Sequence, residues 1–364
     1  MRMKISKLNN FDLIRLLAAL IVVIAHTADI AHYATFEFLS ATFNSRLAVD
    51  VFFIISGFLI YRSFENSNSL VTYFQKRAKR ILPAYVAVIV ISAVALAFIS
   101  DLSWSKYFNA EFFKYIFFNL ATLNFLQPNL PGVFTNQEFQ AVNMSLWTIK
   151  VEIMFYLAVP LIAYVLGKTN KAWGMFAIYL SSILYSTAVV ALFGSAESGI
   201  ALQLEQQLPG QLAFFISGAF LYCFYTELQQ NKIAALAIAT LIIAVHNFAT
   251  QIYFAYPIAL AVLTIYFCLM FRYLGNFGKH GDFSYGMYIW HFPILQVFAH
   301  FNLFERPLIA VPCLFLCIFG ASFISWNWVE KPFLQRRFQP QYVEASEFTG
   351  SSQSQGRVTN LTFK

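Results

Sequence analysis

The sequence contains little charge. Charged residues make up 11% of its 364 residues and hydrophobic residues make up 59%, whereas an ordinary soluble domain carries about 25% charged residues. This balance excludes an ordinary soluble protein. It is typical of a chain that crosses a membrane several times.

Cysteine is also scarce. The chain has four cysteines, all in or beside apolar segments: Cys223, Cys268, Cys313 and Cys317. Their positions fit neither a disulfide framework nor a zinc-binding pattern. We therefore expect no metal site, and we expect Cys313 and Cys317 to be small core residues.

Apolar runs long enough to cross a bilayer occur ten times. They fall near residues 11–31, 46–64, 81–100, 145–167, 172–194, 210–226, 232–249, 252–271, 284–303 and 307–328. A further segment, 107–126, is apolar but carries Glu111 and Lys114. If it lies on or dips into the outer surface, the basic loops all fall on one side, as the positive-inside rule requires. The sequence therefore predicts an all-α polytopic bundle of about ten transmembrane helices with both termini in the cytoplasm.

The net charge of +7 is explained by these loops, because the basic residues lie between apolar runs and not on one nucleic-acid-binding face. We expect membrane lipids and no nucleic acid as partners, and a homo-oligomer stays open. We expect the basic N-terminus to precede an uncleaved first helix. Residues 1–340 are expected to form one transmembrane domain, and the polar residues 341–364 a disordered cytoplasmic tail.

The first span, "FDLIRLLAALIVVIAHTADI", contains three ionisable residues, Asp12, Arg15 and His26. Eleven residues of α-helix turn Arg15 and His26 to within about 20° of each other and separate them by about 16 Å. An ionisable group inside a bilayer usually faces a partner or a water-filled cavity. Arg15 can pair with Asp12 and extend towards the cytoplasm, but this interpretation leaves His26 unexplained.

The second span supplies further polar positions. Asp50 enters at about the depth of His26, where a carboxylate can orient the imidazole of a general base; an interfacial aspartate is the alternative. Ser56 and Gly57 thin the same helix, either for packing or for the approach of a substrate.

A basic cluster follows, formed by Lys76, Arg77, Lys79 and Arg80. Membrane topology and anionic lipid headgroups are sufficient to explain it. A phosphate-rich ligand is the functional alternative, since guanidinium groups suit phosphate oxygens.

The later spans contain a second set of polar positions. Glu152 lies near Trp147 and Lys150, but Lys150 is too close in sequence to share its helical face, so Glu152 is expected to face the bundle interior. Tyr288 and His291 lie on one face of the ninth span, where His291 could line a donor path or be structural. Glu330 ends the last span and could pair with the basic cluster.

In their order along residues 11–335, these segments resemble the acyltransferase-3 family of integral membrane acyltransferases. The matching pieces are the Asp-x-x-Arg opening with His26 eleven residues after Arg15, "VDVFFIISGFLI", "FQKRAKRILP", "SLWTIKVEIMFYLAVP", "FSYGMYIWHFP" and "WVEKPF". Lys150 is a departure, because many relatives carry a small residue there.

The resemblance implies transfer of an acyl group, commonly acetyl, from cytoplasmic acyl-CoA to a hydroxyl of an extracytoplasmic or lipid-linked glycan. It implies a multi-pass protein of the bacterial cytoplasmic (inner) membrane with acyl-CoA (acetyl-CoA) as donor substrate and no permanently bound cofactor. It marks Arg15 and His26 as the functional pair, and it assigns Arg77 and Arg80 to the phosphates of coenzyme A.

The residues and the resemblance together give one predicted site. The expected catalytic residues are His26, Arg15, Asp12, Asp50 and Glu152, and the expected donor-binding residues are Lys76, Arg77 and Arg80. Substrate-binding or structural roles are expected for Ser56, Trp147, Lys150, Tyr288, His291 and Glu330. A membrane transporter or exporter that uses the same polar helix face is the alternative, because ionisable residues are equally expected there.

Overall fold

The computed structural model describes residues 8–31, 38, 42–194 and 199–335, and within these residues the chain is helical and forms no strand. Six helical segments of the described chain are long and apolar enough to cross a membrane. They are α1 (Phe11–Ala31), α3 (Ser45–Glu65), α4 (Leu70–Ala95) with η1 (Leu96–Ile99), α7 (Leu146–Leu166), α8 (Lys171–Phe193), and α15 (Pro307–Ile324) with its continuation through η4 (Ser325–Glu330) into α16 (Lys331–Gln335). An all-α multi-pass membrane protein is thereby confirmed.

Four further helices occupy the other predicted spans. They are α10 (Leu208–Cys223), α12 (Lys232–Phe248), α13 (Tyr256–Ile265) with the π-helical η2 (Tyr266–Met270), and α14 (Phe283–His300). They do not meet the same criteria of length and composition. The number of ten crossings and the side of each terminus therefore stay predictions, and the tail expected at 341–364 lies outside the described residues.

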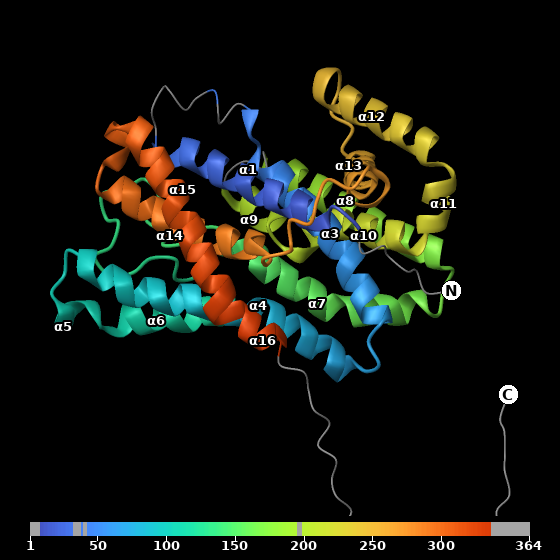
Figure 1. Cartoon of the computed structure of the whole chain (residues 1–364). Coiled ribbons are helices and arrows are strands. Elements are labelled where there is room, and N and C mark those ends of the chain that lie inside the picture. Colours follow the sequence, from blue (N-terminus) through green and yellow to red (C-terminus); the bar gives the residue numbers. More distant parts are fainter. Residues whose placement is uncertain (1–7, 32–37, 39–41, 195–198, 336–364) are drawn as a thin grey trace, which may run out of the picture.

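Helix α3 lies in the middle of the bundle and contacts α1, α7, α10 and α13, while α14 packs between α1, α4 and α15. Figure 1 shows α12 at the rim of the molecule, where it follows α11 (Tyr225–Gln230) and packs against α13. Only Ala239 of α12 is buried. The helices that matter for the site are thus α1, α3, α4, α7 and α14.

Helix α4 begins eleven residues earlier than the apolar pattern predicts. Ser69 caps it, with its Oγ accepting a hydrogen bond from the backbone N–H of Thr72 at 3.1 Å, and a side-chain cap of this kind satisfies a backbone donor that the helix leaves free. The basic cluster therefore lies inside α4 and not before it. Because residues three apart are neighbours on a helix, Arg77 and Arg80 share one face.

The segment 107–126 forms no full span. It contains the end of α5 (Trp104–Tyr107) and the 11-residue α6 (Ala110–Leu120), which is about 16 Å long and too short to cross a bilayer. Helix α6 packs along α4, where the Tyr85 hydroxyl donates to the carbonyl of Asn119 and the Tyr107 hydroxyl to that of Ala93, both at 2.6 Å. This agrees with a segment that dips beside the bundle.

Helices α3 and α10 approach each other at two glycines. A Cβ on Gly57 would lie 1.9 Å from the carbonyl oxygen of Phe215, and one on Gly218 would lie 2.0 Å from that of Ile54. Small residues permit this close backbone contact between membrane helices. The packing interpretation of Gly57 is confirmed.

The expectation for Cys313 and Cys317 is wrong, because both side chains are exposed. Helix α15 buries one stripe, formed by Ala310, Leu314, Ile318 and Ser322. The two cysteines each precede a member of this stripe by one residue. One residue is about 100° of helix, which turns them to the outer face.

We predict that Gly57→Ala and Gly218→Ala each lower the free energy of unfolding by about 1–3 kcal/mol, because the added methyl group forces the two backbones apart. Gly320→Ala is the control, since a Cβ there meets nothing within 4 Å and alanine favours a helix over glycine by about 1 kcal/mol. Denaturant titration of the purified protein in micelles measures the three differences. Equal stability of the Gly57 and Gly320 variants would contradict the close approach.

Candidate active site

Helices α1, α3, α4, α7 and α14 line one pocket in the bundle. One wall is apolar and includes Val49, Phe52 and Phe53. The remaining lining is polar for a bundle interior, with contributions from Arg15, Ser56, Arg77, Arg80, Thr148, Glu152, Tyr156, Ser284, Tyr285 and Tyr288. The pocket therefore collects six of the fourteen predicted site residues.

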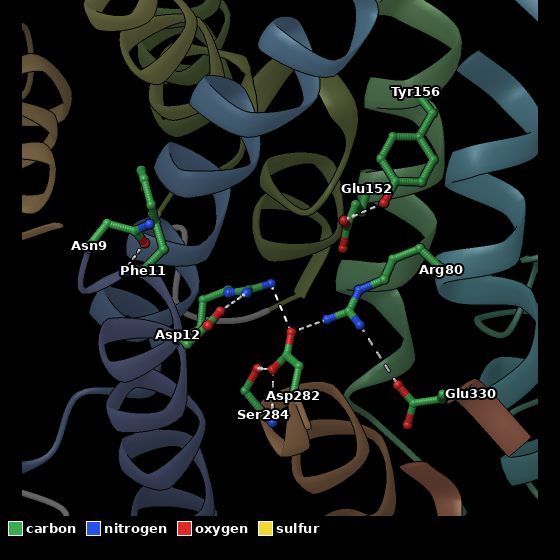
Figure 2. A network of polar contacts seen from close by, with 10 residues as sticks. Asn9, Phe11, Asp12, Arg80, Glu152, Tyr156, Asp282, Ser284 and Glu330 are labelled. Atoms are coloured by element: carbon green, nitrogen blue, oxygen red, sulfur yellow. Dashed lines mark hydrogen bonds and ion pairs between the residues drawn. The ribbon is translucent and has the colours of Figure 1, made fainter. Parts of the chain in front are cut away.

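One carboxylate, Asp282, organises the charged end of this pocket. Its Oδ1 caps α14 by accepting hydrogen bonds from the backbone N–H and the hydroxyl of Ser284, at 3.2 and 2.5 Å. Its Oδ2 pairs with Arg15 at 2.9 Å and also with Arg80. In Figure 2, Asp282 lies between Arg80 on one side and Asp12 on the other. Two guanidinium groups from different helices are thus joined by a residue of a third helix.

The charge state of Asp282 follows from these contacts. Burial alone would raise the pKa of its carboxyl, but the guanidinium groups of Arg15 and Arg80 and the hydrogen bonds from Ser284 hold that pKa well below its usual range. Asp282 is therefore a permanent anion at physiological pH. Its negative charge offsets the repulsion between the two arginines.

Two predicted pairings are confirmed in the same network. Arg15 forms an ion pair with Asp12 one turn earlier in α1. Arg80 lies 4.0 Å from Glu330, which is buried on the π-helical η4 and accepts a hydrogen bond from Ser325 at 3.0 Å. A π-helical turn shifts the register of a helix, and here it carries the carboxylate that faces α4.

Arg77 differs from the other two arginines of the pocket. It donates a hydrogen bond to Ser63 Oγ at 3.1 Å, and its guanidinium lies 5.8 Å from the centre of the Tyr156 ring. Within the described chain it forms no ion pair with a carboxylate. Lys76, from the same cluster, is exposed and donates to Ser67 Oγ at 3.3 Å.

Glu152 lies in the pocket wall, as expected for a residue that faces the bundle interior. Its Oε1 accepts a hydrogen bond from the Tyr156 hydroxyl at 2.6 Å. Lys150 is buried elsewhere, where its Nζ donates to Gln207 Oε1 at 2.8 Å and lies 5.2 Å from the centre of the Phe125 ring. Lys150 is not among the residues that line the pocket.

His26 contacts a second histidine. Its Nδ1 is 2.9 Å from Nε2 of His291, and the two rings lie edge to edge with their planes 19° apart and their centres 5.2 Å apart. His291 is fully buried, and its Nδ1 is 2.6 Å from the carbonyl oxygen of Tyr288. Tyr288 itself lines the pocket, so the histidine pair lies directly behind the pocket wall.

Neither predicted carboxylate partner forms a hydrogen bond with His26 in the described chain. Asp50 is buried close enough to Arg46 and Glu205 to feel their charges, and the pairing of Asp50 with His26 is therefore corrected. Matching depth along two helices does not fix the direction of a side chain around the helix axis. Val49, Phe53 and Ser56 of α3 line the pocket. Asp50 does not line it and lies on a different face of the same helix.

A proline explains the turn that touches His291. Pro293 has no N–H, so the carbonyl of Ile289 cannot make its helical hydrogen bond. That carbonyl instead accepts from Asn143 Nδ2 at 2.9 Å, and Asn143 Oδ1 in turn accepts from the backbone N–H of Ser145 at 3.1 Å. Ser145 Oγ consequently lies 3.3 Å from His291 Nε2.

A second pocket lies beyond the histidine pair. Along α1, His26 lies between Arg15 of the first pocket and Ile30 of the second; along α14, His291 lies between Tyr288 and Gln296. The second pocket is lined by Ile30, Ala31, Asn136, Gln137, Glu138, Phe139, Gln296, Ala299, Asn302 and Phe304. None of these residues is basic.

Trp147 does not line the pocket. Its ring lies at 74° to that of Phe53, with ring centres 6.2 Å apart. No cluster of three or more histidine, cysteine, aspartate or glutamate side chains in the described part of the chain is placed to hold a metal ion.

The sequence does not single out Asp282 as a site residue. The Asp-x-Ser pattern before an apolar run indicates a helix cap, but it does not indicate a bridge between two arginines.

Comparison with known proteins identifies the family of the chain. The acyltransferase domain model called acyltransferase 3 matches residues 8–327. The chain belongs to the acyltransferase-3 family. It is 28% identical over 353 residues to an O-acetyl transferase of Shigella phage Sf6, covering 91% of this chain and 97% of that protein. It is 29% identical over 175 residues to nodulation protein 10 of Rhizobium leguminosarum bv. viciae, covering 45% and 46%. No solved structure matches the chain.

Membership of this family makes the chain a membrane acyltransferase. The catalytic and binding roles of individual residues stay predictions, and the geometry above shows which of them lie together. Arg15, Arg77, Arg80, Ser56, Glu152 and Tyr288 share one pocket. Asp12 and Glu330 are paired with its arginines, His26 and His291 lie behind it, and Asp50, Lys150 and Lys76 point elsewhere.

We predict that Arg80→Met lowers the free energy of unfolding by about 3–5 kcal/mol, because it removes a cation that Asp282 and Glu330 share in a buried site. Lys76→Met is the matched control on the same helix; its side chain is exposed, and the change is expected to stay within about 0.5 kcal/mol. Denaturant titration in micelles measures both. A loss in the Arg80 variant no greater than in the control would show that the network does not stabilise the bundle.

Proposed function

We propose that this acyltransferase transfers an acetyl group from cytoplasmic acetyl-CoA to a hydroxyl of an extracytoplasmic or lipid-linked glycan in the bacterial cytoplasmic membrane. The observation that carries the proposal is the order of groups along α1, with an arginine pocket at one end, a second pocket at the other, and His26 between them. The similarity to a phage O-acetyl transferase over nearly the whole chain supports an oxygen acceptor and an acetyl group.

The donor would bind in the first pocket. Arg77 is the arginine of that pocket with no carboxylate partner in the described chain, so its guanidinium is the one best placed to bind a phosphate of coenzyme A. Arg15 and Arg80 already have carboxylate partners, and they would shape this end of the pocket. The apolar wall formed by Val49, Phe52 and Phe53 suits the uncharged pantetheine arm.

The acceptor would approach from the second pocket. Its polar lining consists mainly of amide side chains, from Asn136, Gln137, Gln296 and Asn302, and it contains no basic residue. Amides both donate and accept hydrogen bonds, as hydroxyl groups do. This lining therefore favours a neutral, hydroxyl-rich sugar over a phosphorylated acceptor.

In the proposed reaction, His26 acts as general base. It takes the proton of the acceptor hydroxyl while the hydroxyl oxygen attacks the thioester carbon. A carbon–oxygen bond forms, the carbon–sulfur bond breaks, and the proton passes from His26 to the leaving thiolate, which yields the acetyl ester and the free thiol of coenzyme A. The substrates supply all the atoms of the products, and no oxidant or further co-reactant is needed.

We expect His26→Ala to lower the rate of acetyl transfer by at least about 100-fold, since a positioned general base contributes about 10²–10⁴ to a rate. The assay follows thiol release from acetyl-CoA by the purified protein with glycan extracted from the producing cells, and mass spectrometry of that glycan counts the acetyl groups. His246→Ala, on the rim helix α12, is the control. Passage of glycan across vesicle membranes without thiol release would contradict the proposal and favour a transporter.

We expect Arg77→Gln to raise the KM for acetyl-CoA by about tenfold or more while the protein stays folded, because a charge-assisted hydrogen bond contributes about 1.5–3 kcal/mol. Lys114→Gln removes the same charge from the exposed face of α6 and should leave the KM unchanged. Initial rates across a range of acetyl-CoA concentrations measure both. An unchanged KM in the Arg77 variant would remove this residue from the donor site.

A further inference from the structure

The hydrogen bonds around His291 fix the position of its proton. Its Nδ1 lies 2.6 Å from the carbonyl oxygen of Tyr288, and a carbonyl oxygen can only accept. Nδ1 of His291 therefore carries a hydrogen. Since a neutral imidazole has one ring N–H, its Nε2 presents a lone pair.

The neutral form is the one this environment favours. His291 is fully buried, and its hydrogen-bond partners are a carbonyl, a serine hydroxyl and a second imidazole. No carboxylate is among them. A buried charge without an opposite charge beside it carries a large desolvation cost, so a second proton on His291 is strongly disfavoured.

The same reasoning extends to His26. Because Nε2 of His291 accepts, the 2.9 Å contact requires Nδ1 of His26 to donate. The hydrogen of neutral His26 is then on Nδ1, and its Nε2 holds the free lone pair. His26 is partly exposed, whereas the nitrogen that faces His291 is occupied. Nε2 is thus the one ring nitrogen of His26 available as a base.

We propose that His291 is a positioning residue that holds His26 in the tautomer with a basic Nε2. In this relay His26 Nδ1 donates to His291 Nε2, and His291 Nδ1 donates to the Tyr288 carbonyl. This inference rests on the proposed function of His26 as general base. In the serine-protease triad an aspartate performs the same orienting task. Here the orienting group is a neutral imidazole, itself fixed by a backbone carbonyl.

A neutral orienting group has a chemical consequence for the transfer. An aspartate stabilises the imidazolium that forms during the reaction, whereas a neutral imidazole compensates its charge much less. The proton that His26 takes from the acceptor hydroxyl is therefore released more readily to the departing thiolate. The relay suits a reaction in which the base must return its proton within the same turnover.

Two substitutions separate orientation from packing. In His291→Gln, the side-chain oxygen can take the place of Nε2 and accept from His26 Nδ1, so we expect kcat to stay within about tenfold of the original enzyme. In His291→Leu the side-chain volume is kept but the hydrogen-bond acceptor is lost. We expect kcat to fall by about 100-fold or more, because a wrong histidine tautomer also lowers kcat strongly in the serine-protease triad. The KM for acetyl-CoA should not change in either variant. His300→Leu, at the far end of the same helix, is the control.

A spectroscopic measurement tests the proton positions without any assay of activity. Nitrogen-15 NMR of the full chain with labelled histidine, in lipid nanodiscs, distinguishes a protonated ring nitrogen from one with a lone pair. We expect the His26 signals, assigned by their loss in His26→Ala, to show a protonated Nδ1 and an unprotonated Nε2, and this pattern to persist in His291→Gln. A protonated Nε2 on His26, or equal rates in the Gln and Leu variants, would overturn the proposal. Absence of acetyl transfer by the original enzyme would instead overturn the proposed function and leave the NMR result to decide the tautomer.

Discussion

The carboxylate of Asp282 is the contact on which the rest of the site depends. It starts α14 by capping it, and it holds Arg15 of α1 and Arg80 of α4 at the same point. From this point α1 and α14 run in the same direction to a second contact, the pair of His26 and His291. Eleven residues of α1 and nine of α14 span the interval, which corresponds to about 13–16 Å of helix. Two parallel helices joined at both ends thus set the distance between the charged end of the pocket and the imidazole.

Charge balance explains why this end of the pocket can be so polar inside an apolar bundle. A buried arginine is tolerated when carboxylates and hydrogen bonds compensate it, and Asp12, Asp282 and Glu330 do so for Arg15 and Arg80. The compensated arginines keep the pocket open and hold three helices together. Arg77 lies next to them and forms no ion pair within the described chain; it contacts a hydroxyl and an aromatic ring, and it is close enough to Glu152 to feel the charge of that side chain. Arg77 is therefore the arginine of the pocket without a bound carboxylate, and an anionic ligand is its natural complement.

The sequence predicts those features of the fold and the site that a single helix determines. It does not predict those that depend on how several helices pack together. The common face of Arg15 and His26, the inward direction of Glu152 and the packing role of Gly57 are properties of single helices, and periodicity predicts them. The apolar pattern does not predict the start of α4, because Ser69 caps the helix ahead of its apolar stretch. The bridge made by Asp282 and the partner of His26 depend on which helices pack together and at what rotation. Spacing along the chain contains no such information, and it misplaces Asp50 because it gives the depth of a residue along a helix but not the rotation of that helix against its neighbours.

The orientation of His291 can be traced to a break in the hydrogen-bond ladder of α14. Pro293 deprives the carbonyl of Ile289 of its helical donor, and Asn143 supplies a replacement from the loop before α7. That loop then brings Ser145 Oγ to 3.3 Å from Nε2 of His291. A hydroxyl both donates and accepts, so this contact suits either tautomer, and the Tyr288 carbonyl at Nδ1 decides where the proton lies. The proline, the asparagine and the serine thus shape the surroundings of the imidazole, and the carbonyl selects its tautomer.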